Sequence, residues 1–458
     1  MSWPCAFCVS LPTLHPKPAP TVACPARRAA RAAATMSVLL AALVTARTAS
    51  AADEPQAPAP ASAPASTPNR LSESEIREGW ILLFDGETLF GWRHGGKADW
   101  RVADGTIVVE RGEPGLLLTS TRWADYVLRV DFRADAGTNS GVFLRTPAGS
   151  GAGPQQPGAG QQPGQQPGQQ PGPGDVATTC YEMNIDDSPA APFPTGSFVG
   201  RKRCEPQPPA SSEWRTCEIV AQGGRFTVRI DGRQTLDYVD PRPVACGHVG
   251  LQHNHGRVAF RNVKLKPLGA RSLFDGKDLS GWRVHPDSKC EWSVTPDGRL
   301  HVRNGRGQLE TEGRYADFVL QLEAFVNGKS LNSGVFFRAI PGEFWNGYES
   351  QIQNAFRGGD RTKPVDCGTG GIYRRVNARK VVADDFQWLA KTIVADGPRI
   401  AVWVNGYQVT DWTDTRKPHA NPRNGLRLAA GSIILQSHDP TTDFYFRNLR
   451  IAELPPAH

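Results

Sequence analysis

The sequence of 458 residues has no acidic side chain before Asp53, and after that point it has no apolar stretch of about 20 residues, the length needed to cross a bilayer as a helix. It also has little excess charge beyond its start. Five basic side chains precede Asp53, and they leave +2 of the total net charge of +7 for the rest of the chain. We therefore expect no membrane span and no binding to nucleic acid.

The lack of acidic residues at the start is typical of a targeting segment. A basic patch at Arg27–Arg31 is followed by a short apolar run, Val38–Val44, and then by the small residues Ala49–Ala51. We interpret residues 1–51 as a signal segment, which predicts a periplasmic or secreted protein. Residues 52–78 begin with a run rich in Ala, Pro and Ser, and are predicted to be a disordered linker.

Cysteine pairs with the spacing of a zinc site are absent after the signal segment. Six cysteines remain there, and no two of them are separated by only two residues: Cys180, Cys204, Cys217, Cys246, Cys290 and Cys367. Export would permit disulfides, so both pairing within each half and free buried thiols stay open.

Helical periodicity is also absent over any long stretch, whereas alternation with period two is common. Tyr126–Arg133 and Arg225–Ile230 alternate apolar with polar residues, and Asp231-Gly232 and Asn405-Gly406 have the composition of two-residue hairpin turns. The sequence therefore predicts an all-β protein built from antiparallel sandwiches or jelly rolls.

The chain repeats itself once. LFDGETLFGW at 83–92 returns as LFDGKDLSGW at 273–282, NSGVFLR at 139 returns as NSGVFFR at 332, and FRN at 260 returns at 446. Landmarks in the same order indicate a tandem duplication, with domains at 79–268 and 270–455. The first copy alone contains a run of Gly, Pro and Gln at 149–174, which is predicted to be a disordered insert.

A polar sheet face is predicted in the second copy between Leu331 and Asn354. Period two places Asn332, Gly334, Phe336 and Arg338 on one face, and it places Glu349, Gln351 and Gln353 in one row of the next strand. This face is too polar for a core, so we interpret it as the floor of a binding groove.

A pair of carboxylates suited to direct glycoside hydrolysis is missing from this floor. Glu182 and Asp186 share a face in the first copy, but four residues of strand separate them by about 13 Å, beyond the roughly 5 to 9.5 Å of glycosidase pairs. The second copy has Glu349 alone in the corresponding row. His253 and His438 each follow a Leu-Gln pair, and either could ligate a metal or act as an acid or base.

The ordered combination of LFDG with GW, NSG-V-F-x-R, YExQI, TGG-I-Y and LQ-x-H leading to FRN resembles the 3-keto-disaccharide hydrolase family. The resemblance covers nearly all of both copies. It implies two tandem concanavalin-like jelly-roll β-sandwiches that act on oxidised (3-keto) sugars or glycosides, as 3-keto-glucoside 1,2-lyases and 3-keto-2-hydroxyglucal hydratases. It also implies a possible divalent metal ion, of unknown ligands, and no organic cofactor.

Removal of a proton beside a ketone needs one base, an electrophile for the enolate oxygen and an acid for the leaving group. We assign Glu349 and His438 as the acid and base, or as metal ligands. The predicted substrate-binding residues are Asn332, Arg338, Trp345, Tyr348, Gln351 and Tyr373.

The second copy fits the family pattern better, because the first has Asn184 and Phe198 where we align Gln351 and Tyr373. We therefore expect the second copy to be the catalytic one. Second-site candidates in the first copy are Asn139, Arg145, Glu182 and His253. Two alternatives remain: a non-catalytic, lectin-like pair of carbohydrate-binding modules, and a laminarinase-like hydrolase of unoxidised glucan.

Overall fold

The computed structural model describes residues 67–147 and 179–456. The predicted signal segment and the 149–174 insert lie outside these residues, as does the linker up to residue 66. The linker prediction is wrong for residues 67–78, which contain helix α1 (Glu73–Glu78). Ser72 accepts from the Glu75 amide while the Glu75 side chain accepts from the Ser72 amide, a capping box that starts the helix.

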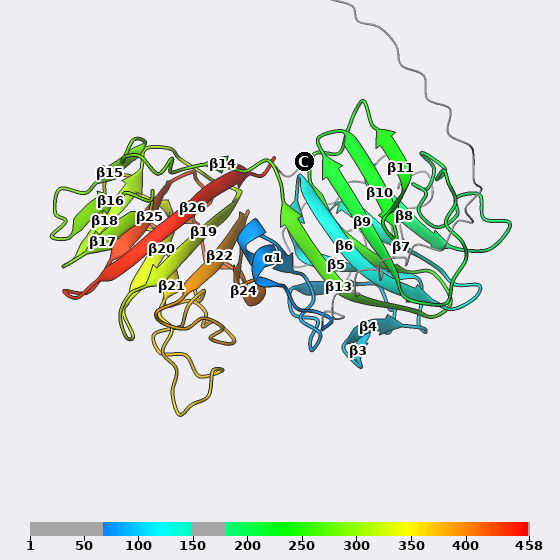
Figure 1. Cartoon of the computed structure of the whole chain (residues 1–458), viewed down its shortest axis with the longest axis horizontal. Coiled ribbons are helices and arrows are strands. Elements are labelled where there is room, and N and C mark those ends of the chain that lie inside the picture. The colour runs from blue at the N-terminus through cyan, green and yellow to red at the C-terminus, as the bar shows by residue number, and fades with distance from the viewer. Residues whose placement is uncertain (1–66, 148–178, 457–458) are drawn as a thin grey trace, which may run out of the picture. The chain divides into compact units, whose positions relative to one another are not determined.

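The first copy forms a sandwich of an eight-stranded and a five-stranded antiparallel sheet (Figure 1). The larger sheet has the order β11-β10-β9-β6-β13-β4-β3, with β1 also paired to β13, and the smaller has the order β2-β5-β12-β7-β8. Their bounds are β1 Ile81–Leu82, β2 Trp92–Gly95, β3 Arg101–Ala103, β4 Thr106–Val109, β5 Gly115–Trp123, β6 Tyr126–Ala134, β7 Asn139–Thr146, β8 Tyr181–Asp186, β9 Arg215–Gln222, β10 Arg225–Ile230, β11 Arg233–Val239, β12 Gly247–His253 and β13 Val258–Pro267.

The second copy repeats this topology strand for strand. Its eight-stranded sheet has the order β16-β17-β26-β19-β22-β23-β24, with β14 also paired to β26, and its five-stranded sheet has the order β15-β18-β25-β20-β21. Their bounds are β14 Arg271–Ser272, β15 Trp282–Val284, β16 Glu291–Val294, β17 Leu300–Arg303, β18 Gly307–Thr311, β19 Phe318–Val326, β20 Ser333–Ala339, β21 Tyr348–Ile352, β22 Trp388–Asp396, β23 Arg399–Val404, β24 Tyr407–Thr413, β25 Ser432–Ser437 and β26 Asp443–Glu453.

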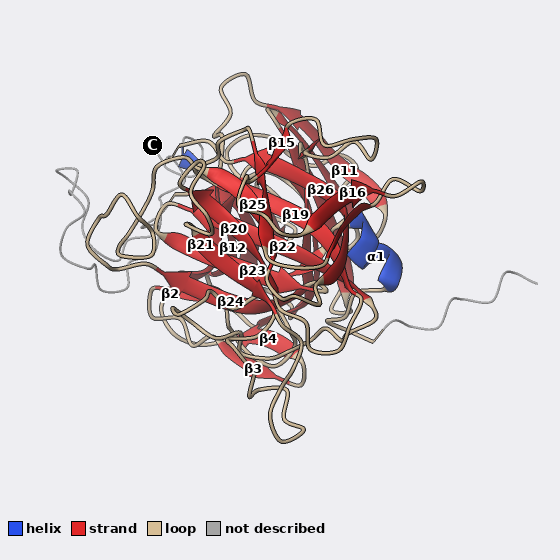
Figure 2. Cartoon of the chain, turned by 90° about the vertical axis from the view of Figure 1, so that its left-hand side faces the viewer, coloured by secondary structure: helices blue, strands red, loops and turns tan. Residues whose placement is uncertain are grey.

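The predicted fold class is confirmed: strands dominate the described part of the chain, and the fold is a pair of all-β sandwiches (Figure 2). Alternation along the strands builds each core. In β6, for example, Tyr126, Leu128, Val130 and Phe132 are buried, while the residues between them are partly exposed. Each core therefore lies between the inward rows of its two sheets.

The sandwiches also contact each other within the described residues. The rings of Trp123 and Trp403 meet edge-on at 5.8 Å, and Trp403 Nε1 donates to the Leu82 carbonyl at 2.8 Å. Arg122 Nε donates to Asp396 Oδ1 at 2.8 Å, and both side chains are buried. Burial of this ion pair makes each partner dependent on the other.

The six cysteines within the described residues are free thiols. Of the two possibilities left open by the sequence, the structure therefore shows the unpaired one. Among the described residues, no helix is both long and apolar enough to span a bilayer.

Candidate functional site

Glu349 lies at the centre of a row that crosses the five-stranded sheet of the second sandwich. It is opposite Phe336 on β20, which pairs with Ile434 on β25, which in turn pairs with Glu310 on β18. A side chain at Gly334 would meet Glu349 Oε1 at 2.7 Å, so glycine leaves the space that this carboxyl group occupies. Glu349 is only 5% exposed, and burial raises its pKa to about 7.

Arg423 reaches Glu349 from a loop that sequence reasoning missed. Its Nη2 lies 3.3 Å from Glu349 Oε2 and donates to the Trp345 carbonyl at 3.0 Å. Its guanidinium also lies over the ring of Phe336, at 5.3 Å. The positive charge of Arg423 opposes the effect of burial and lowers the pKa of Glu349. Arg423 therefore brings a cation to the carboxylate.

The signal for Arg423 was a difference in loop length between the copies. Asp414 and Asp240 have equivalent places in the two sandwiches. Asp414 accepts from the hydroxyl of Tyr348, the first residue of β21, and Asp240 accepts from that of Tyr181, the first residue of β8. From Asp414 the chain runs 17 residues to Gly431, whereas from Asp240 it runs 7 residues to Gly247. The longer connection carries Arg423.

His438 follows β25 and points to the same side of the sheet as Ile434 and Gln436. Its Nδ1 lies 2.7 Å from Asp439 Oδ1, and Asp439 Oδ2 accepts from the Asn332 backbone amide at 3.0 Å. The charge on His438 lowers the pKa of Glu349, so the structure brings these two predicted residues into electrostatic contact.

Trp345 packs against the buried residues Phe336, Ala339 and Ile434 on the sheet face that carries Glu349. Its backbone amide donates to Gln308 Oε1 at 2.8 Å, and its indole Nε1 donates to the Gly307 carbonyl at 3.1 Å. The His438 ring stacks on it at 5.4 Å and the Arg306 guanidinium lies 4.1 Å from its centroid. These protein groups already contact the Trp345 ring. Trp345 therefore packs over the sheet face and does not offer an open ring face for a sugar to stack on.

Asn332 and Gln351 lie together beside Glu349, as predicted. Gln351 Nε2 donates to Asn332 Oδ1 at 2.9 Å, and both amide groups donate to Asp366 Oδ2, at 3.0 and 2.9 Å. Tyr373 is also near, because its backbone amide donates to the Glu349 carbonyl at 2.9 Å and its ring lies 5.5 Å from the Arg423 guanidinium. Asp366 is a second residue that sequence reasoning missed.

Arg338 and its counterpart Arg145 do not lie in the groove, contrary to prediction. The Arg338 side chain is fully buried, donates to the carbonyls of Ala316, Gly397 and Arg427, and pairs with Asp317 Oδ1 at 2.6 Å. A shift of register between Phe336 and Ala339, with a φ of +45° at Arg338, ends the simple alternation there. Arg145 makes the same set of bonds in the first sandwich, to Ala124, Gly223, Val244 and Asp125.

Tyr348 also lies away from the groove. Its hydroxyl donates to Asp414 Oδ2 at 2.7 Å and its ring packs on Phe337 at 5.6 Å, within the core between the sheets. It belongs to the row opposite Glu349, so it supports the strand instead of contacting a ligand.

The first sandwich retains the carboxyl group but little of what surrounds it. Glu182 is buried, its pKa is raised to about 7 by burial, and Gln252 forms a hydrogen bond with it. Asn139 donates to Asp186 at 3.2 Å. His253 does not correspond to His438, because it alternates with Gln252 and points to the other side of β12. Asn254 takes the place of His438.

The alignment of Phe198 with Tyr373 is also corrected. Val199 donates to the Glu182 carbonyl as Tyr373 does to that of Glu349, so Val199 is the counterpart of Tyr373. By register, Leu116 and Leu118 replace Gln308 and Glu310 on the floor. The first sandwich thus has a more apolar groove face without the cation, the histidine or the tyrosine.

A divalent metal was expected as a possible cofactor. In residues 67–147 and 179–456, no group of three or more His, Cys, Asp or Glu side chains is arranged to hold a metal ion. The nearby carboxylates of Asp366 and Asp439 are hydrogen-bonded to amide groups and to His438, and they do not complete with Glu349 the set of three protein ligands usual in catalytic zinc sites. We therefore derive no step through a metal.

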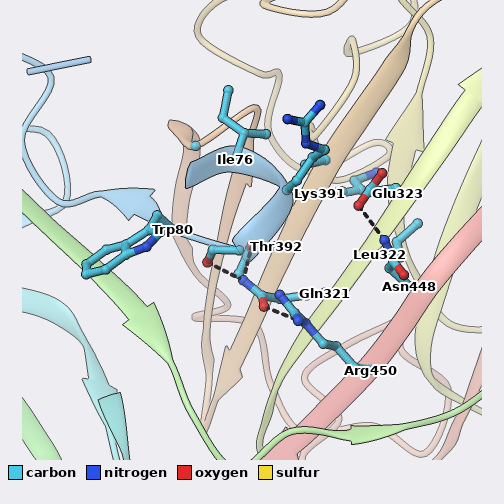
Figure 3. A pocket seen from close by; sticks show the side chains of 13 residues that line it. Ile76, Trp80, Gln321, Leu322, Glu323, Lys391, Thr392, Asn448 and Arg450 are labelled. Atoms are coloured by element: carbon cyan, nitrogen blue, oxygen red, sulfur yellow. Dashed lines mark hydrogen bonds between the residues drawn. The ribbon is translucent and has the colours of Figure 1, made fainter. Parts of the chain in front are cut away.

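A small crevice lies elsewhere, between α1 and the outer face of the eight-stranded sheet of the second sandwich (Figure 3). Its volume is about 20 Å³, enough for a single water molecule. Gln321 bonds to Thr392 and Arg450 there, and Glu323 bonds to Asn448. The crevice is too small for a sugar.

Several known proteins are similar to parts of this chain. One curated relative, a 3-keto-disaccharide hydrolase from Bacteroides thetaiotaomicron, is 31% identical over 78 residues, which cover 14% of this chain and 27% of that protein. A solved Parabacteroides distasonis protein, provisionally named a glycosyl hydrolase, is 21% identical over 44% of this chain and all of its own, with a TM-score of 0.35. The carbohydrate-binding module CBM66 from Bacillus subtilis is 17% identical over 38% of this chain and 94% of its own, with a TM-score of 0.27.

The family match covers both sandwiches. Residues 79–266 and residues 269–452 each match the family described as the 3-keto-alpha-glucoside-1,2-lyase-like domain. Together these two stretches make up most of the sequence. The chain therefore belongs to the 3-keto-alpha-glucoside-1,2-lyase-like family, of which it contains two tandem domains.

Proposed function

We propose that the second sandwich removes the C2 proton of a 3-keto-glycoside, expels the group at C1, and then hydrates the resulting 3-keto-2-hydroxyglucal. One observation carries the proposal: a single buried carboxyl group, Glu349, whose pKa of about 7 suits proton transfer at neutral pH, lies beside a cation and a histidine. The family match supports a carbohydrate substrate, and the oxidised form of that substrate is part of the proposal.

In the first step the Glu349 carboxylate takes the proton from C2, and the electron pair of that C–H bond forms a C2=C3 double bond as the ketone becomes an enolate. The Arg423 guanidinium stabilises the negative charge on the enolate oxygen. In the second step the enolate reforms the ketone, a C1=C2 double bond forms, and the C1–O bond to the leaving group breaks.

His438 protonates the leaving oxygen. Asp439, 2.7 Å from His438 Nδ1, holds the ring in one orientation and leaves Nε2 to carry the transferred proton. Hydration reverses the sequence with water: His438 accepts a proton from the water that adds to C1, and Glu349 returns a proton to C2. The sum of the two reactions is hydrolysis of the glycoside.

The geometry favours this route over hydrolysis by two carboxylates. The nearby Asp366 carboxylate is held by the side-chain amides of Asn332 and Gln351. Glu310 is the other acidic residue in the transverse row, but three strand spacings separate it from Glu349, which is about 14 Å between backbones. Its carboxylate also accepts from the Gly342 amide at 3.1 Å. Pairs that act on one glycosidic bond lie within roughly 5 to 9.5 Å.

The test is incubation of the full chain with a 3-keto-glucoside, with and without added divalent metals, while the 2-hydroxyglucal intermediate and the free 3-keto sugar are followed. We expect turnover in the wild type and in Glu182→Gln, and its loss in Glu349→Gln. Absence of turnover with every metal supplied would refute the proposal.

The same experiment separates the alternatives. Saturable sugar binding without turnover, unaffected by Glu349→Gln, would identify a lectin-like pair of modules. Release of reducing sugar from an unoxidised glucan would identify a laminarinase-like hydrolase. We also propose that the protein is exported, which detection of the mature chain in the periplasm or medium would test.

A further inference from the structure

Lys391 is a buried amine that the proposed mechanism does not use. It lies on β22, in the same inward-facing row as the core residues Leu389 and Ile393, and it is 1% exposed. Its Nζ donates to the backbone carbonyls of Ser350 at 2.8 Å and Gln351 at 2.7 Å. Both acceptors are on β21, directly after Glu349, so the amine joins the larger sheet to the strand that carries the candidate base.

The fold does not require an amine at this position. In the first sandwich the equivalent residue is Cys217, which is fully buried between neighbours Val130 and Ile230, as Lys391 is between Leu322 and Val404. A small apolar thiol therefore fills this place in the same topology. Burial of an amine is costly, and none of the ion pairs among the described residues includes Lys391. A function at the groove would account for that cost.

Lys391 interacts electrostatically with Glu349, the candidate base. Burial lowers the pKa of Lys391 to about 7, whereas Cys367 and Glu349 act in the opposite direction and favour the ammonium form. Its neighbours on β19 and β23 are apolar. Arg423, His438 and Asp366 are the charged groups that act most on the pKa of Glu349. Lys391 interacts with Glu349 from the interior side of the strand.

We propose that Lys391 is a positioning residue for the groove of the second sandwich: it fixes the β21 backbone behind Glu349 and supplies a positive charge that favours the carboxylate. The placement of Lys391 is independent of the reaction, whereas its effect on catalysis rests on the proposed function. Removal of this charge should make Glu349 a proton acceptor only at higher pH.

The test compares Lys391→Met, which keeps most of the side-chain volume, with Lys391→Cys, which copies the residue of the first sandwich. Thr392→Val is the matched control, because Thr392 is the next residue on β22 but bonds to Gln321 on the outer face. In both Lys391 variants we expect the acid limb of kcat/KM to move up by about one pH unit, with kcat reduced more than KM is changed. An unmoved acid limb in folded variants would overturn the proposal.

A second measurement does not depend on turnover. The side-chain carboxyl signal of Glu349, labelled with ¹³C and assigned by its loss in Glu349→Gln, is titrated in the wild type and in both Lys391 variants. We expect its midpoint to rise by about one pH unit when Lys391 is replaced, and to stay in place in Thr392→Val. A shift without any turnover would refute the proposed function and uphold the positioning role, and an unchanged midpoint would overturn that role.

Discussion

Replacement of Glu349 by glutamine should stabilise the protein at alkaline pH while leaving its stability at acid pH unchanged. Burial raises the pKa of Glu349 from 4.5 to about 7 in the folded chain. Below pH 4.5 the carboxyl group is protonated in both folded and unfolded states, so its contribution is constant. As pH rises toward 7 the unfolded chain releases this proton first, and the folded state loses stability.

The magnitude follows from that difference in pKa. Each unit corresponds to about 1.4 kcal/mol, so the wild type carries a penalty of about 3 kcal/mol above pH 7 that a neutral glutamine does not carry. For a domain of this size the free-energy difference corresponds to a Tm higher by roughly 6–12 °C at pH 8. The side chain is almost wholly buried, so solvent screening changes this value little.

Thermal unfolding followed by circular dichroism between pH 4 and pH 8.5 measures the effect. Glu182→Gln should behave similarly, because burial also raises the pKa of Glu182 to about 7. Glu312 is exposed and Glu312→Gln provides the control. If Glu349→Gln and the wild type lose stability in parallel as pH rises, the carboxyl group is not desolvated as described, and the assignment of its role loses its main support.

Three further predictions concern the arginines and their partners. Arg423→Met should raise the pKa of Glu349, because Arg423 lowers it, and should move the acid limb of kcat/KM to higher pH. It should also reduce kcat/KM by about 100-fold. An unchanged pH profile would show that Arg423 does not belong to the site. Arg338→Met should cost about 3 to 5 kcal/mol in urea unfolding, and a loss of activity in a fully folded variant would instead return Arg338 to the groove. Asp396→Ala should destabilise by a similar amount because it leaves Arg122 buried without its carboxylate, and reversal by the double variant with Arg122→Leu would confirm the cause.

Local sequence patterns predicted the architecture well because the fold depends on alternation. Two copies of the same strand pattern and the NG and DG turns were sufficient to predict the duplicated sandwich. Glu349 and Gln351 were also placed correctly, because β21 is regular from Tyr348 to Ile352. Along such a strand, the face to which a side chain points depends only on whether its residue number is odd or even, which we call its parity.

The errors arose where parity fails or where contacts depend on distant loops. A bulge turns Arg338 away from the row that parity predicts for it, and bulges have no strong sequence signal. His253 was matched to His438 by composition, although the strand places Asn254 there. Arg423 and Asp366 come from loops, and the position of a loop side chain depends on tertiary contacts that a single sequence does not contain.

The bulged arginine that both sandwiches share has a bearing on the history of the gene. Arg145 and Arg338 have the same left-handed backbone, at φ of +52° and +45°, and the same pattern of carbonyl and carboxylate partners. So detailed a match is inherited, which dates the feature to the single-domain ancestor, before the duplication. The loop of Arg423 and the amine of Lys391 occur in one copy only, and so record gain or loss after the two copies began to diverge.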